Sequence, residues 1–90
     1  DALILLPWEN EKSLGIKEIL TRKENLNKKQ IVLIIGPEGG FEAEEVEKAR
    51  KQGALPLSLG PRILRTETAS LAALTIIMYQ LGDLGGVKIE

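Results

Sequence analysis

Two glycine-containing segments carry the residue types in this sequence that are best suited to chemistry. The first, GPEGGF at 36–41, follows the apolar run IVLII and precedes a charged segment. The second, LGPRILRTETA at 59–69, brings arginines, threonines and a glutamate up against a long apolar stretch. Glycine lets a backbone approach a ligand closely, and the polar side chains can orient that ligand. The two segments are therefore the candidate binding loops.

The first segment is poorly suited to phosphate, because it lacks both the GxGxxG and the GK[ST] of nucleotide-binding loops. Four carboxylates crowd the start of the helix predicted after it, where they complement the helix dipole and would repel a phosphate. They are Glu38, Glu42, Glu44 and Glu45. A neutral or cationic ligand suits these charges better. S-adenosylmethionine, with a sulfonium, an ammonium and no phosphate, is such a ligand. A tight turn that simply needs glycine is an equal alternative for this segment taken alone.

The second segment offers complementary groups. Ile63 and Leu64 provide apolar contact for an adenine, and Arg62 and Arg65 could reach a phosphate or a base. Glu67 could accept a hydrogen bond. Helix capping or an ion pair explains each polar residue more simply when it is considered alone. Two such loops at adjacent strand ends favour a binding site.

Three apolar runs with strand character would position these loops, at residues 2–6, 31–35 and 55–59. Each run ends in proline or in Gly-Pro. The run IVLII is β-branched and apolar on both alternating faces, which predicts a strand covered on both sides. The segment TRKENLNKKQ at 21–30 is expected to be a solvated loop.

A helix is predicted after each strand, over residues 13–22, 42–52 and from 66 or 68 to 81. Gly15 weakens the first prediction. Gly53 and Gly82 are natural stops for the second and third, and a threonine is the expected N-cap of the third. The residues expected to face the sheet are Leu14, Ile19 and Leu20 in the first helix and Phe41, Val46 and Ala49 in the second.

Alternating strands and helices predict an α/β fold with a mainly parallel sheet flanked by helices. Ligands of such sheets bind beyond the carboxyl ends of the strands, so all three turns should lie along one edge. The sequence shows no internal repeat and no interior linker, so we expect a single unit.

The third predicted helix carries no charge from Thr68 to Leu81. A helix that is apolar on most sides is buried on most sides. One face can cover the sheet, whereas the other faces need more protein or a second copy of the chain. A homodimer through this helix is the economical interpretation.

Composition sets further bounds. Ninety residues suffice for one small domain, and 43% hydrophobic with 28% charged residues is a globular balance. A net charge of −1 argues against strong nonspecific binding of nucleic acid, because such binding needs clustered Lys and Arg to neutralise phosphates. The sequence has no Cys and no His, which excludes disulfides, zinc fingers and His-dependent mechanisms within these residues. We expect no metal, no membrane span and a cytoplasmic location.

Three stretches, LIIGPEGGFEAEEVEKA, LSLGPRILRTETASLAAL and GDLG, closely resemble the C-terminal part of the RsmE family. These are bacterial methyltransferases of the SPOUT, or α/β-knot, superfamily, and the resemblance covers nearly the whole chain. It implies methylation of uridine N3 in small-subunit (16S) ribosomal RNA with S-adenosylmethionine as the cofactor. It also implies a deep trefoil knot and a homodimer in which the final helix is a principal contact.

The resemblance also implies roles for individual residues. Backbone groups of the knotted loops would bind the cofactor at Gly36, Pro37, Glu38 and Gly39, and at Ser58, Leu59, Gly60, Ile63 and Leu64. Leu6, at the end of the first strand, is expected to line the same pocket. Arg65, and after it Arg62, is expected to position RNA or stabilise an ionised uracil. Glu67 or Glu38 is expected to accept the uracil proton.

Full-length members of the family have an N-terminal RNA-binding domain and further methyltransferase residues upstream. We therefore expect residues 1–90 to be the C-terminal part of a methyltransferase domain that is inactive alone. Another SPOUT enzyme, acting on ribose 2′-oxygen or on transfer RNA, is the nearest alternative. Ribose-directed relatives usually show a GNE-type loop, whereas Pro37 follows the glycine in this sequence. A noncatalytic dimerisation fragment is the alternative of another class.

Overall fold

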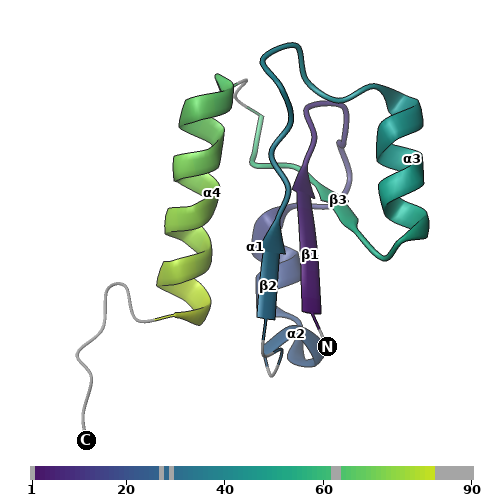
Figure 1. The fold of residues 1–90 in the computed structure, drawn as a ribbon. Coiled ribbons are helices and arrows are strands. Elements are labelled where there is room, and N and C mark those ends of the chain that lie inside the picture. The colour runs from purple at the N-terminus through teal and green to yellow at the C-terminus, as the bar shows by residue number, and fades with distance from the viewer. Residues whose placement is uncertain (1, 27, 29, 62–63, 83–90) are drawn as a thin grey trace, which may run out of the picture.

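The computed structural model describes residues 2–26, 28, 30–61 and 64–82. Three parallel strands form a sheet in the order β2-β1-β3, and helices flank it (Figure 1). The strands are β1 Ala2–Pro7, β2 Gln30–Leu33 and β3 Leu55–Leu57, and the helices are α1 Ile16–Thr21, α2 Lys23–Leu26, α3 Ala43–Lys51 and α4 Thr66–Leu81. This arrangement confirms the predicted α/β fold with its parallel sheet.

The central strand is β1, which pairs Leu3 with Ile31 of β2 and Leu5 with Leu55 of β3. The prediction that residues 31–35 form a strand covered on both sides is wrong for the described part of the chain. The strand β2 lies at the edge of the sheet and ends at Leu33, and Val32 is 37% exposed. The face of β2 that carries Val32 is therefore open among the described residues. Hydropathy does not predict this, because it does not report which other elements pack on a strand.

The core lies between the sheet, α1 and α4. Its cluster of buried side chains comprises Leu3, Leu5, Leu57, Ile16, Ile19, Leu20 and Ile77. The apolar side predicted for the first helix is therefore confirmed, although that helix is shorter than expected. It begins at Ile16 because Gly15 is extended and forms a parallel bridge with Ser58. In this bridge the N–H of Ser58 donates to the carbonyl oxygen of Leu14 at 2.7 Å, and the N–H of Ile16 donates to the carbonyl oxygen of Ser58 at 3.0 Å.

The helix α3 matches its prediction to within one residue at each end. The backbone N–H of Glu42 donates to Oε1 of Glu45 at 2.8 Å in a capping box, which satisfies a group left free at the start of the helix. Val46 is buried, and Phe41 and Ala49 are half-buried, so the predicted inward face is also confirmed. In Figure 1 α3 lies beside β3, on the opposite side of the sheet from α4.

The segment predicted as a solvated loop contains the short helix α2. Asn25 is buried there, and its Nδ2 donates to the carbonyl oxygen of Ile19 at 2.8 Å. That carbonyl lies in the last turn of α1 and also accepts the backbone N–H of Arg22 at 3.3 Å. The buried amide adds a second hydrogen bond at this helix end, and a scan for charge and polarity does not detect it.

The helix α4 begins at the expected place, but its N-cap is Arg65 and not a threonine. Thr66 instead donates its hydroxyl to the carbonyl oxygen of Pro37 at 3.3 Å. Ala73 and Ile77 are buried, whereas Leu71 and Tyr79 are each 67% exposed. One face of this helix, which is uncharged from Thr68 onward, therefore packs on the core, and apolar side chains on its other faces meet solvent. None of the helices in the described ranges is both long and apolar enough to cross a membrane.

Candidate functional site

One cavity of about 460 Å³ lies beyond the carboxyl ends of the strands. Its walls are the segment after β1, the glycine turn 36–41 after β2, and the segment from Ser58 to the start of α4. The two predicted loops thus meet at one site, as expected for a parallel sheet. They do not follow adjacent strands, however, because β1 lies between β2 and β3. The segment after β1 therefore contributes a third wall.

The glycine turn is held by its own chain. The backbone N–H of Gly40 donates to the carbonyl oxygen of Pro37 at 2.8 Å. A Cβ placed on Gly36 would lie 2.9 Å from Cε2 of Phe41, which is shorter than a normal contact between two carbon atoms. A side chain at Gly36 would therefore have to displace the ring of Phe41.

The second loop is shaped by Ser58 and Gly60. The Ser58 hydroxyl accepts the N–H of Gly60 at 3.0 Å and donates to the carbonyl oxygen of the same residue at 3.2 Å. Gly60 has φ of +120°, a backbone conformation that glycine adopts without the steric cost of a Cβ. The bond from Thr66 to Pro37 then joins this loop to the glycine turn.

Most of the predicted cofactor-binding residues line the cavity. Those on its walls are Gly36, Pro37, Glu38, Gly39, Ser58, Leu59, Gly60 and Leu64. Leu6 is 1% exposed and lies in the core, while its neighbour Pro7 lines the cavity. Successive side chains of a strand point to opposite faces of the sheet, so Leu6 and Pro7 do not share a face. The prediction for Leu6 considered only that it lies at the end of the strand. Ile63 and Arg62 lie outside the described residues.

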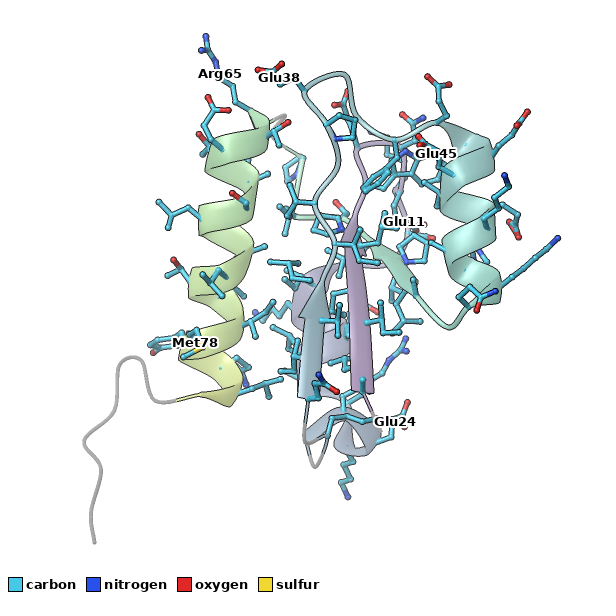
Figure 2. All side chains as sticks on the ribbon, viewed as in Figure 1. Glu11, Glu24, Glu38, Glu45, Arg65 and Met78 are labelled. Atoms are coloured by element: carbon cyan, nitrogen blue, oxygen red, sulfur yellow. The ribbon has the colours of Figure 1, made fainter. Side chains whose placement is uncertain are left out.

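Two of the residues predicted to be catalytic line the cavity. Arg65 and Glu38 both line it and both are exposed at the same end of the molecule (Figure 2). Glu67 is exposed on the first turn of α4 and is not among the lining residues. Within the acidic group around the turn, Glu42 and Glu45 cap α3, which leaves Glu38 as the member that faces the cavity.

The segment after β1 carries lining residues that sequence reasoning missed: Trp8, Glu9, Asn10 and Lys12. Pro7 was a usable signal, because it ends a strand on the same edge as the two glycine loops. Glu11 anchors this segment. Its pKa is lowered by the hydrogen bond from the Ser13 hydroxyl at 2.8 Å and by backbone N–H groups of Ser13 and Leu14, all of which favour the carboxylate.

The chemistry of the wall is mixed. Backbone groups of two glycine-containing loops, apolar surface from Leu59 and Leu64, the carboxylate of Glu38 and the cation of Arg65 all border one space. Such a site can hold an amphipathic ligand with both an apolar ring and charged groups. Across the described residues, no three acidic, histidine or cysteine side chains come together as a metal site.

Comparison with known proteins gives a consistent result. A family model described as an RNA methyltransferase domain matches residues 1–78. Ribosomal RNA small subunit methyltransferase E of Buchnera aphidicola subsp. Schizaphis graminum is 43% identical over 88 residues, which cover 89% of this chain and 36% of that protein. The protein of the same name from Bacillus subtilis is 50% identical over 56 residues, or 62% of this chain and 22% of that protein. The chain thus spans only about a third or less of these curated relatives.

Two solved structures share the fold. A crystal structure of a hypothetical protein superposes with a TM-score of 0.69 at 39% identity, over 87% of this chain and 38% of that chain. A methyltransferase structure from Legionella pneumophila, in complex with the bound cofactor SAM, superposes with a TM-score of 0.67 at 41% identity. It covers 84% of this chain and 29% of the other.

Proposed function

The chain belongs to the family of RNA methyltransferase domains, and from this premise we propose that it binds S-adenosylmethionine for methylation of uridine N3 in small-subunit ribosomal RNA. One observation carries the proposal. The two glycine loops border a single cavity at the carboxyl edge of a parallel sheet, and a relative with the same fold and 41% identity has the cofactor SAM bound.

The wall residues fit this cofactor. Glu38 offers a negative charge for a sulfonium or an ammonium, and Leu59 and Leu64 offer apolar contact for an adenine. The space beside Gly60 where a Cβ would project is open, with no atom within 4 Å, so a ligand can approach the backbone there. We propose that the backbone of the wall residues in both loops supplies most of the hydrogen bonds, and we retain Ile63 from the sequence. Leu6 would support the site by packing in the core, without touching the cofactor.

Once bound, S-adenosylmethionine supplies a methyl group carried on a sulfonium. Glu38, exposed on the cavity wall, would accept the proton that uracil N3 must lose. Arg65 would stabilise negative charge on the ionised base through its guanidinium. The loops would align the reacting groups, and the 90 residues themselves contain no cysteine that could form a covalent intermediate. Glu67 is the alternative acceptor and Arg62 the alternative cation.

We further propose that residues 1–90 supply the cofactor loops to a longer methyltransferase with its RNA-binding part upstream. The chain covers only 36% and 22% of the two relatives, which supports the proposal that it is part of a longer protein. The exposed apolar side chains of α4 support a homodimer through that helix. The trefoil knot and the cytoplasmic location expected from the family resemblance stay predictions.

Two measurements test the proposal. Calorimetry of the full-length protein with S-adenosylmethionine should show binding, whereas a noncatalytic dimerisation fragment should show none. Mass spectrometry of nucleosides from small-subunit ribosomal RNA treated with the protein should then reveal a uridine methylated on the base. A methyl group on ribose, or methylation of transfer RNA alone, would instead assign the chain to another SPOUT activity.

A further inference from the structure

Trp8 lies in the segment after β1 and bonds both to the last residue of β3 and to the glycine turn after β2. We propose that it is a positioning residue, which fixes the glycine turn 36–41 in the conformation that binds the cofactor. This inference rests on the proposed function and adds to it a residue from the wall that the sequence motifs do not include.

The main chain of Trp8 is held from two sides. Its backbone N–H donates to the carbonyl oxygen of Leu57 at 2.9 Å, which fastens the segment after β1 to the end of β3. Its carbonyl oxygen accepts the N–H of Glu11 at 3.0 Å, which closes a turn. Glu11 is in turn fixed by Ser13 and Leu14. The Trp8 side chain therefore projects from a well-defined base.

The side chain of Trp8 reaches the glycine turn. Its Nε1–H donates to the carbonyl oxygen of Phe41 at 3.4 Å, a partly buried bond between residues 33 positions apart. The ring of Phe41 lies directly against Gly36, at the position where a Cβ would come within 2.9 Å. The indole thus holds one end of the turn through Phe41, and Phe41 covers the other end.

The bond from Trp8 is longer than the usual 2.9–3.0 Å of an N–H···O bond, so its contribution is modest. Removing it should loosen the turn without unfolding the domain, because Phe41 and Gly36 keep their packing. A looser turn must be ordered when the ligand binds, and that ordering costs affinity. The effect should appear in cofactor binding and not in the methyl-transfer step at saturating cofactor.

The test is Trp8→Phe in the full-length protein, because phenylalanine keeps an aromatic ring and lacks the N–H donor. The Kd and KM for S-adenosylmethionine should rise about three- to tenfold, while kcat at saturating cofactor should stay within about twofold. The control Glu24→Gln, an exposed change at the opposite end of the sheet, should alter none of these values (Figure 2).

Two local readouts separate positioning from general stability. Hydrogen exchange of the Gly40 amide, which donates to Pro37 within the turn, should accelerate in Trp8→Phe while the amides of β1 keep their protection. Trp8 is also the single tryptophan of the 90 residues. Its emission, taken as the difference between the parent and Trp8→Phe, should change when S-adenosylmethionine is added.

Each outcome decides the matter. Unchanged cofactor affinity in Trp8→Phe, with a parent that binds S-adenosylmethionine, overturns the role of Trp8 and leaves the proposed function standing. A general loss of stability, seen as uniformly faster exchange or failure to fold, shows that Trp8 is structural and also overturns it. A parent protein that does not bind S-adenosylmethionine overturns the proposed function, and with it the inference.

Discussion

Substituting alanine for Gly36 tests whether the glycine turn is set by packing. The new Cβ would lie 2.9, 3.0 and 3.2 Å from Cε2, Cδ2 and Cζ of Phe41. Carbon atoms in good contact are about 3.5–4.0 Å apart, so the ring must move by roughly half an ångström or more. The backbone adds no cost, because Gly36 is not among the described residues with positive φ. Overpacking of this kind costs about 1–3 kcal/mol, and the half-buried state of Phe41 points to the lower part of that range.

The assay is urea unfolding of four full-length proteins: the parent, Gly36→Ala, Phe41→Leu and the double variant. Leucine lacks the ring atoms that the new Cβ would meet, so the alanine should cost less than about 0.5 kcal/mol in the Phe41→Leu background. The coupling between the two positions should be about 0.5–3 kcal/mol. Gly39→Ala is the matched control, since nothing lies within 4 Å of its Cβ position, and it should be neutral or slightly stabilising.

An equal cost of the alanine in both backgrounds would refute the reasoning, because the clash with Phe41 would then not be its source. Cofactor affinity of the double variant adds a second result. Recovered stability together with recovered affinity would mean that Gly36 serves the turn alone. Recovered stability without recovered affinity would mean that the ligand itself needs bare backbone at this position.

Three other perturbations follow from the same structure. Arg65→Ala should leave cofactor binding nearly intact in calorimetry and slow RNA methylation at least about tenfold, or about 1.4 kcal/mol of barrier, and unchanged turnover would remove Arg65 from the mechanism. The lowered pKa of Glu11 contributes stability that is present above the carboxyl's ordinary pKa and is lost as pH falls through the lower folded value. Urea unfolding of Glu11→Gln should therefore depend less on pH than the parent between about pH 6 and about pH 3, and parallel pH curves would contradict this. Leu71→Glu, on the exposed face of α4, should halve the mass measured by light scattering, and an unchanged mass would exclude that face as the dimer contact.

Local patterns in the sequence were enough for much of the fold. The strand β1 ends at its predicted Pro7, whereas β2 and β3 end at Leu33 and Leu57, before Gly36 and Gly60. Proline and glycine act on their own backbone, so they set the turn without setting the last residue of the strand. The helices α3 and α4 were located closely, since their charge pattern and their stop signals are also local. The glycine loops could be paired before the structure was known, because parallel strands bring their carboxyl ends to one edge.

The rest depended on which segments become neighbours. Hydropathy predicted a strand at 31–35 with both faces covered, yet Val32 is 37% exposed, because the elements that pack on a strand are set by the whole fold. The buried amide of Asn25 and the hydroxyl of Thr66 each bond a carbonyl in another element, and polarity alone does not reveal such partners.

What the sequence determined by itself is the three strands, the three longer helices, the two glycine loops and the lack of charge from Thr68 to Leu81. Those features arise from backbone preferences and hydrophobic periodicity, which act within a few residues. Only the tertiary structure decided that the segment after β1 stands between the two loops, that Trp8 contacts Phe41, and that Leu6 faces the core while Pro7 faces the cavity. These are contacts between residues distant along the chain, and they exist only once the sheet has set the strands side by side.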